Sequence, residues 1–167
     1  MNENYIVING KKIELTEEQL KQLGIASEKK RKNPFDRVPA DEIYFTAAVE
    51  TAQVFCEQGD FNDDKLFTGV NYFNDEAFAN QVALHQLLYR KLLKFAYDNE
   101  CEDTAGWDCA LYHYIIMFNP MEKRFEATWL REWKSLCTVY FNSKDSAERA
   151  IKEVVEPFMK EHPEFVW

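Results

Sequence analysis

Carboxylate side chains in two short loops are the residues of this sequence best placed to act on a partner. The first loop spans residues 57–64 and the second spans residues 98–103. Carboxylates gathered on one surface imitate the phosphates of a nucleic acid and steer a basic partner toward it, which raises the association rate. Acidic loops also serve simply to keep a surface soluble. The carboxylates that we predict to bind a partner are Glu57, Asp60, Asp63, Asp64, Glu100, Glu102 and Asp103.

Side chains that usually perform catalysis are few and stand in no known pattern. The three histidines, His85, His113 and His162, lie in no recognised nucleophile or metal motif. Because the whole chain has five glycines, loops in which glycines cradle a phosphate are excluded. We therefore predict a binding protein that has no cofactor and no enzymatic activity.

Two groupings have some features of a metal site but lack the required spacing. Residues 60–64 have the acid content of a calcium loop, yet the sixth and twelfth positions are Lys65 and Asn71, where an EF-hand needs glycine and glutamate. Cys101 and Cys109 lack the Cys-x2-Cys spacing that places two thiolates on one zinc ion. We expect no metal site, and we expect all the cysteines to be reduced because a chain of this length folds without disulfides.

A second candidate surface combines aromatic and basic residues in the C-terminal half. Aromatic side chains pack most often in cores, but they also form interface hot spots and stack on nucleotide bases. Arg124, Arg131 and Lys134 are close enough in sequence to meet phosphates there. A nucleotide pocket is therefore an alternative to the acidic surface. The aromatic residues concerned are Trp107, Trp129, Trp133, Trp167, Tyr112, Tyr114 and Tyr140.

The composition indicates one folded and acidic chain. Of its 167 residues, 46% are hydrophobic and 15% are aromatic, which is enough apolar surface to offset the entropy lost on folding. The formal net charge of −9 disfavours binding to nucleic acid or to an anionic membrane. The sequence shows neither an apolar stretch of membrane-spanning length nor the pattern of a signal peptide, so we expect a soluble intracellular protein.

The negative charge is concentrated in two segments. Residues 35–76 hold ten acidic and two basic residues, and residues 98–108 hold five acidic residues and no basic one. Between them, residues 77–97 hold three basic residues and no acidic one. The acidic segments therefore flank the helix expected between them. Whether the two segments lie close together in space depends on the fold.

The N-terminal part is predicted to be a small module, residues 1–25, made of a hairpin and a helix. Asn-Gly at positions 9–10 favours the tight turn of a hairpin. Thr16 is a good N-cap for the helix, and Gln19 completes a capping box. Residues 26–34 carry four consecutive cations and are predicted to be a solvated basic linker.

The main domain, residues 35–167, is predicted to belong to the α+β class, with antiparallel sheet covered on one face by two long helices. Runs of strands followed by a helix favour this class over a parallel α/β fold. A string at residues 70–79 is echoed at residues 139–147, so two βββα lobes are expected, although convergent capping explains the same likeness. The strands are expected at residues 42–47, 52–57, 65–73, 111–119, 124–132 and 136–141.

Both helices of the main domain are predicted from their apolar periodicity. Residues 77–97 are apolar around most of the circumference, which indicates a largely buried helix. The second helix begins near Ala147 and carries one apolar stripe as far as Phe158, with Pro157 expected to end or kink it.

The strings at residues 6–16, 33–38 and 71–73, and the ending from Val139 to Trp167, resemble small accessory proteins that are common in phages and prophages of low-GC Gram-positive bacteria. The resemblance implies a mobile-element protein that acts in the cytoplasm of a bacterial host. Such proteins include anti-CRISPR and anti-restriction inhibitors, which are small acidic proteins that often occupy the DNA-binding cleft of a nuclease. The resemblance implies no site residue.

Charge layout and resemblance together predict a non-enzymatic inhibitor that docks on the basic surface of a host defence protein, with a CRISPR nuclease as one candidate target. One alternative is a protein that sequesters a nucleotide defence signal in the aromatic pocket. Another is a structural or assembly protein that oligomerises through residues 1–25.

Overall fold

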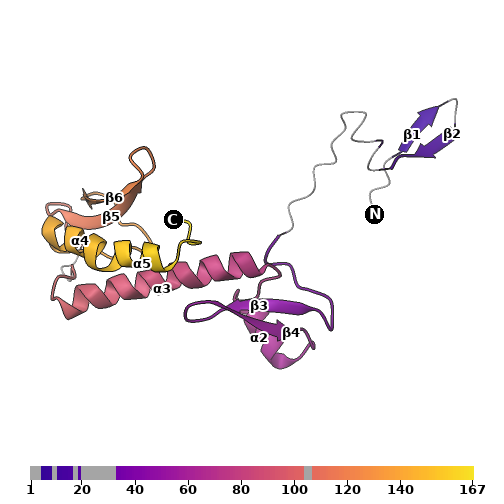
Figure 1. The fold of residues 1–167 in the computed structure, drawn as a ribbon, viewed down its shortest axis with the longest axis horizontal. Coiled ribbons are helices and arrows are strands. Elements are labelled where there is room, and N and C mark those ends of the chain that lie inside the picture. Colours follow the sequence, from indigo (N-terminus) through magenta and orange to yellow (C-terminus); the bar gives the residue numbers. More distant parts are fainter. Residues whose placement is uncertain (1–4, 9–10, 17–18, 20–32, 104–106) are drawn as a thin grey trace. The chain divides into compact units, whose positions relative to one another are not determined.

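The structure is a computed structural model that describes residues 5–8, 11–16, 19, 33–103 and 107–167. The chain divides into two units, Met1–Asn33 and Pro34–Trp167. Within the described residues, helices occur together with antiparallel strand pairs, which confirms the predicted α+β class (Figure 1).

The described residues of the smaller unit form a hairpin. Strand β1 (Tyr5–Ile8) pairs antiparallel with β2 (Lys11–Glu14). The predicted capping box is present, because the Thr16 N–H donates to Gln19 Oε1 at 2.9 Å and the Gln19 N–H donates to Thr16 Oγ1 at 3.3 Å. The predicted hairpin turn at 9–10, most of the following helix and most of the basic linker at 26–34 lie outside the described residues.

The larger unit contains two hairpins and a set of helices. Strands β3 and β4 form one antiparallel pair, and strands β5 and β6 form another. In chain order the elements are β3 (Ile43–Ala47), β4 (Ala52–Cys56), α2 (Phe61–Thr68), α3 (Glu76–Asp98), β5 (His113–Asn119), β6 (Arg124–Leu130), α4 (Lys144–Ala150), the π-helical turn η1 (Ile151–Val155) and α5 (Glu156–Glu161).

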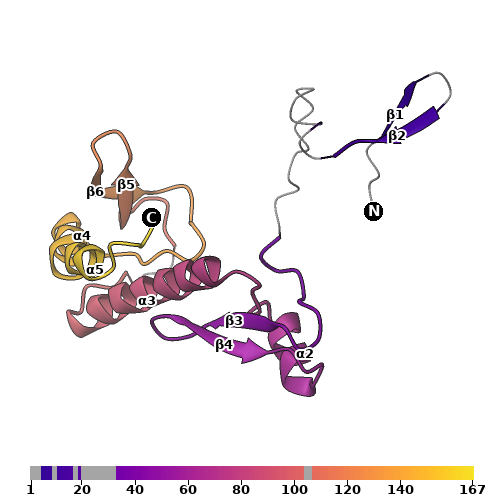
Figure 2. The same ribbon diagram turned by 45° about the vertical axis from the view of Figure 1, so that its right-hand side comes forward.

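Helix α3 is the central element of this unit. It is 23 residues long, and the Asp75 side chain caps its start by accepting a hydrogen bond from the Phe78 N–H at 3.0 Å. The β3–β4 hairpin packs against one side of α3, and α4 and η1 pack against another (Figures 1 and 2). The predicted helix at residues 77–97 is therefore confirmed, but it is not largely buried, because nine of these 21 residues, including Arg90, Lys91 and Lys94, are exposed.

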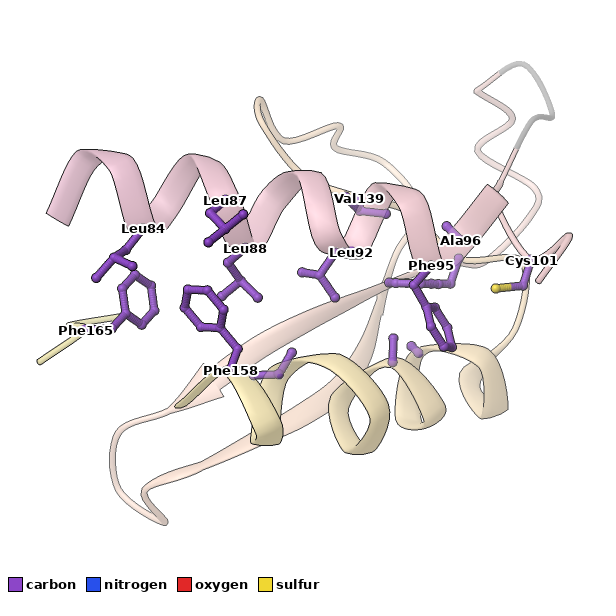
Figure 3. Packing of buried hydrophobic residues seen from close by; sticks show 14 residues of the cluster. Leu84, Leu87, Leu88, Leu92, Phe95, Ala96, Cys101, Val139, Phe158 and Phe165 are labelled. Atoms are coloured by element: carbon purple, nitrogen blue, oxygen red, sulfur yellow. The ribbon is translucent and has the colours of Figure 1, made fainter. Parts of the chain in front are cut away.

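The main core lies between α3 and the C-terminal helices (Figure 3). Leu84, Leu88 and Leu92 project from α3 toward Phe158 of α5, and Phe165 closes one end of the cluster. Residues of β5 and β6 pack against the same cluster with partly buried side chains. A smaller cluster of buried residues, Phe45, Phe73 and Ala79, joins the β3–β4 hairpin to the start of α3.

The third strand of each predicted βββα lobe is not formed, so duplicated lobes are not confirmed. Residues 61–68 are helix α2, because Asp60 caps a helix there and forms a capping box with Asp63. What remains of the first strand is one antiparallel bridge between Phe73 and Phe45, and what remains of the second is Phe141, which bridges to both Tyr114 and Glu102. Both strand remnants lead directly into a capped helix, which explains the repeated string.

The last helical segment continues past Pro157. Its apolar stripe is buried at Ala147, Ile151, Val155 and Phe158, as predicted from the spacing. Pro157 lies in the first turn of α5, directly after the π-helical turn η1. A proline has no N–H and its ring crowds the carbonyl four residues earlier, so a wider turn before Pro157 lets the segment continue where an α-helix would kink.

We expect Leu84→Ala to destabilise the larger unit by about 2 to 5 kcal/mol, because Leu84 is 2% exposed in the core and its truncation leaves a cavity. The control is Leu136→Ala, since Leu136 is 93% exposed and its loss should change stability by less than about 0.5 kcal/mol. Urea unfolding followed by circular dichroism measures both, and equal effects of the two variants would contradict this core.

Candidate functional site

Glu57 is the centre of a hydrogen-bonded network in the first acidic loop. Its side chain is 3% exposed, and Arg37 donates to both of its oxygens, from Nε to Oε2 at 3.0 Å and from Nη2 to Oε1 at 2.8 Å. The Tyr72 hydroxyl donates to Oε2 at 2.6 Å, and the Gly59 N–H donates to Oε1 at 2.9 Å. The hydrogen bonds from Arg37 are the largest cause that lowers the pKa of Glu57, so this buried carboxylate stays ionised.

Asp63 is also held inside the protein. It is 5% exposed, and the Tyr44 hydroxyl donates to its Oδ1 at 2.7 Å. The backbone N–H groups of Gln58 and Asp60 donate to its Oδ2 at 2.8 and 3.2 Å. The bond from Tyr44 is the main cause that lowers the pKa of Asp63. Glu57 and Asp63 are therefore buried structural groups. The prediction that they lie on a binding surface is wrong.

Asp60 and Asp64 keep their charges on the surface of the same loop. Asp60 is the N-cap of α2, and its Oδ1 accepts hydrogen bonds from the N–H groups of Asn62 and Asp63 at 2.7 and 3.0 Å. Asp64 is 61% exposed and accepts a hydrogen bond from Arg37 Nη1 at 2.6 Å. Both carboxylates remain accessible to a partner while they help to fix the loop.

Residues 34–76, which we call the acidic lobe, carry most of the negative charge of the described chain. Their basic residues are Arg37 and Lys65, and Arg37 is bound to Glu57 and Asp64. The lobe therefore presents a surface of strongly negative potential. Its exposed acidic residues are Asp36, Asp41, Glu42, Glu50, Asp60, Asp64, Asp75 and Glu76.

The second acidic loop begins at the C-terminus of α3. The N–H groups of Glu100 and Cys101 donate to the carbonyls of Tyr97 and Ala96, which is the hydrogen-bond pattern of a Schellman motif. Glu100 takes the left-handed position of this motif, with φ of 50°, where glycine is usual. Its side chain is exposed, so this turn places a carboxylate in solvent at some cost in backbone strain.

Asp103 is committed to a buried histidine. The Asp103 carboxylate is hydrogen-bonded to His113 Nδ1, and the Asp108 carbonyl lies 3.0 Å from His113 Nε2. His113 is 1% exposed and stacks on the Trp107 ring, with 4.0 Å between ring centroids. The Asp103 carboxylate and the Asp108 carbonyl both accept hydrogen bonds, so both ring nitrogens of His113 must donate. A ring that donates from both nitrogens is the protonated imidazolium. Burial alone would lower the pKa of His113, but the bonds to Asp103 and Asp108 raise it above its ordinary value.

Helix α3 keeps the two acidic loops apart. Residues 57–60 join β4 to α2 and residues 61–64 begin α2, near the N-terminal end of α3, whereas the loop at 98–103 follows the C-terminal end of α3 (Figures 1 and 2). A helix of 23 residues is about 34 Å long. The seven predicted carboxylates therefore do not form one continuous surface.

The cations of the alternative nucleotide pocket are engaged with other side chains. Arg131 lies over the Tyr112 ring at 5.2 Å, and the Lys134 ammonium lies over the Trp107 ring at 5.8 Å. Arg124 donates to Glu126 at 2.9 Å and forms an ion pair with Glu122 at 2.7 Å. Only Arg124 is paired with carboxylates among the described residues, and the side chains of all three cations are exposed.

The described residues contain neither a membrane-spanning helix nor a cluster of metal ligands. None of their helices is long and apolar enough to span a bilayer. Nor do their His, Cys, Asp and Glu side chains gather in threes at a site that could hold a metal ion. No protein-family profile, curated protein or solved structure matches the sequence. The function must therefore be inferred from the side chains themselves.

We expect Tyr72→Phe to lower the free energy of unfolding by about 1.5 to 3 kcal/mol, the usual contribution of a hydrogen bond to a charged group. The variant removes the donor to Glu57 Oε2 and leaves the packing of the ring intact. Tyr112→Phe is the matched control, because it removes the same atom from a half-exposed side chain. A smaller effect at Tyr72 than at Tyr112 would show that the network does not stabilise the loop.

The His113 pair predicts a stability that falls as the pH rises. A histidine whose pKa is raised on folding adds stability that is complete below its unfolded pKa of about 6.5 and is lost as the pH passes its folded pKa. The difference in unfolding free energy between the wild type and Asp103→Asn should therefore be largest near pH 6 and shrink toward pH 9. Urea unfolding across this range measures it, and a constant difference would contradict a protonated His113.

Proposed function

We propose that this chain is a non-enzymatic binding protein of phage origin that inhibits a host defence protein. The acidic lobe docks on a basic, DNA-binding surface of the target, as the carboxylates of an anti-CRISPR-like inhibitor do. A CRISPR effector nuclease is one candidate target. The resemblance to phage accessory proteins supports the proposed phage origin, and the negative charge of the acidic lobe supports docking on a basic surface.

The observation that carries the proposal is the imbalance of exposed charge on residues 34–76. Eight exposed carboxylates stand against Lys65 and the already engaged Arg37. A field of one sign accelerates encounter with an oppositely charged surface and weakens as salt screens it. Glu42 and Glu50 are exposed members of this set, and their carboxylates take no part in the side-chain hydrogen bonds of Glu57, although the Glu42 carbonyl accepts from the Glu57 N–H.

The buried network gives the acidic lobe a fixed shape. Arg37 ties Glu57 to Asp64, and Tyr44 ties β3 to Asp63 of α2, so the loop that carries Asp60 and Asp64 is held from two sides. A surface that is ordered before binding loses less conformational entropy when the complex forms. This support favours a lobe that acts as a rigid docking surface.

The proposal assigns the docking surface to only some of the predicted carboxylates. The loop at 98–103 lies beyond the other end of α3, and its Asp103 is paired with His113. A partner that covers the acidic lobe therefore need not reach this loop. Of the seven predicted carboxylates, Asp60 and Asp64 are the two that belong to the proposed surface.

DNA cleavage by purified CRISPR effector nucleases from Gram-positive hosts tests the proposal. The wild-type chain should inhibit at least one nuclease at low salt, and less strongly at high salt. Glu42→Lys with Glu50→Lys should weaken inhibition at least about tenfold, because like charges then face the basic surface.

The matched control is Glu132→Lys with Glu156→Lys, which changes the net charge equally at exposed positions outside the lobe. This control should inhibit nearly as well as the wild type. Equal losses in the two double variants would show that the acidic lobe is not the docking surface, and no inhibition of any nuclease would reject the target class.

A further inference from the structure

Strand β4 forms an exposed edge of the β3–β4 hairpin in the acidic lobe (Figure 2). All of its residues after Ala52 are exposed, with Val54 at 57% and Phe55 at 40%. Folded proteins usually protect an edge strand with a charged side chain, a proline or a bulge. Strand β4 reads Ala-Gln-Val-Phe-Cys and pairs with β3 in continuous register, so it has none of these protections.

The pairing of β3 on its other side fixes which backbone groups of β4 point outward. Phe45 of β3 uses both its N–H and its C=O on Phe73, at 2.8 Å in each direction. Val54 lies opposite Phe45, so the two form a non-hydrogen-bonded pair and the N–H and C=O of Val54 point away from β3. Because these directions alternate along a strand, the N–H and C=O of Cys56 point outward too. None of these four groups has a hydrogen-bond partner among the described residues.

Helix α3 closes one end of this edge. Asn80 of α3 accepts a hydrogen bond from the Ala52 N–H at its Oδ1, at 2.7 Å. This N–H lies two residues before that of Val54 and points outward in the same way. The open part of the edge is therefore residues 53–56.

Apolar side chains lie beside the open backbone groups. Val54 and Cys56 share one face of the hairpin, and Cys56 lies opposite Ile43 of β3. Ile43 and Val54 are each 57% exposed, and Cys56 is exposed as well. A strand added to β4 would cover this apolar face while it satisfies the backbone groups.

The chain around β4 is acidic. Glu50 lies two residues before the strand and Asp60 lies four residues after it, and both side chains are exposed. Residues 38–64 contain seven acidic residues and no basic one. A second copy of the chain would bring two such regions together, so charge opposes pairing between copies. A strand that carries basic residues is attracted instead.

The cations that border this region reduce its negative charge without cancelling it. Arg37 is held in the two ion pairs described above. Lys65 is an exposed residue of α2, and Arg90 of α3 donates to the Val49 carbonyl at 3.1 Å, at the hairpin turn. These three cations stand against seven acidic residues, so the region stays negative.

From these observations we propose that β4 accepts an extended basic segment of the partner as an added strand. The N–H and C=O groups of Val54 and Cys56 form the new backbone hydrogen bonds, and apolar side chains of the segment cover Val54. Lysine or arginine side chains of the segment meet the carboxylates on either side of β4. The inference rests on the proposed function, because β4 belongs to the acidic lobe, and it adds the form in which the partner docks.

Titration of the isotope-labelled full chain with two peptides, followed by NMR, tests the inference. The basic probe is acetyl-Lys-Val-Thr-Val-Thr-Val-Lys-amide, and the acidic probe has glutamate in place of both lysines. The basic peptide should produce saturable shifts of the Val54 and Cys56 amides. The acidic peptide should bind at least about fivefold more weakly at low salt, because the charges then repel. Absence of saturable shifts with the basic peptide, or equal affinity for both peptides, would overturn the inference.

Val54→Pro removes one outward N–H and leaves the bonds between β4 and β3 in place, since an edge strand tolerates proline where the N–H faces solvent. It should weaken binding of the basic peptide about three- to tenfold, the effect of one backbone hydrogen bond. Val54→Thr is the matched control, because it keeps the N–H and the branched side chain, and it should bind nearly as well as the wild type. Unchanged affinity in Val54→Pro, with its hairpin intact by NMR, would contradict an added strand.

Hydrogen exchange of the wild type gives a second measurement that needs no variant. Bound basic peptide should slow exchange of the Val54 and Cys56 amides, and unaltered exchange at saturation would overturn the inference. Slowing that depends on the concentration of the chain alone, without peptide, would identify a second copy as the occupant and would also overturn it.

The nuclease assay separates this inference from the proposed function. If Glu42→Lys with Glu50→Lys weakens inhibition and Val54→Pro does not, docking through the acidic lobe stands and the added strand is overturned. If the chain inhibits no nuclease, the proposed function fails, and the peptide titration still decides whether β4 accepts a basic strand.

Discussion

Burial of α3 is the constraint on which the rest of the larger unit depends. A helix that is apolar around most of its circumference must be covered on several sides, and the β3–β4 hairpin and the C-terminal helices provide that cover. The acidic loops at 57–64 and 98–103 lie near opposite ends of this helix, while the β3–β4 hairpin packs along its side (Figures 1 and 2). The element that holds the core together therefore also separates the negative charges, which leaves residues 34–76 as one self-contained acidic surface.

Within that surface, carboxylates of the same kind have three different environments. Glu57 and Asp63 are buried and saturated with donors, and this keeps both ionised. Asp60 caps a helix while it stays in solvent. The carboxylates of Glu42 and Glu50 face solvent outside those side-chain hydrogen bonds. Burying a carboxylate without its donors is very unfavourable, so Arg37, Tyr44 and Tyr72 are required for the loop to take this shape.

Local patterns in the sequence predict the parts of this fold that depend on neighbours in the chain. Such parts include the helix predicted from the periodicity of residues 77–97 and the Thr16–Gln19 capping box. They also include the strands of the three described hairpins. The side chains that donate to Glu57 are 15 and 20 residues away, and no local signal distinguishes its buried carboxylate from an exposed one. The apolar run at 65–73 resembled a strand, but a capping box starting at Asp60 directs its first part into α2. Pairing of Asp103 with His113 and burial of one Glu102 oxygen likewise depend on tertiary contacts.

The central claim is that the exposed acids of residues 34–76 form the docking surface, while the loop at 98–103 takes no part in it. Hydrogen–deuterium exchange of the chain, alone and bound to a nuclease that it inhibits, tests this most directly. The account predicts slower exchange of backbone amides across β3, β4 and α2 in the complex, with residues 98–103 unchanged. Protection confined to residues 98–140, with unaltered exchange in residues 34–76, would contradict it.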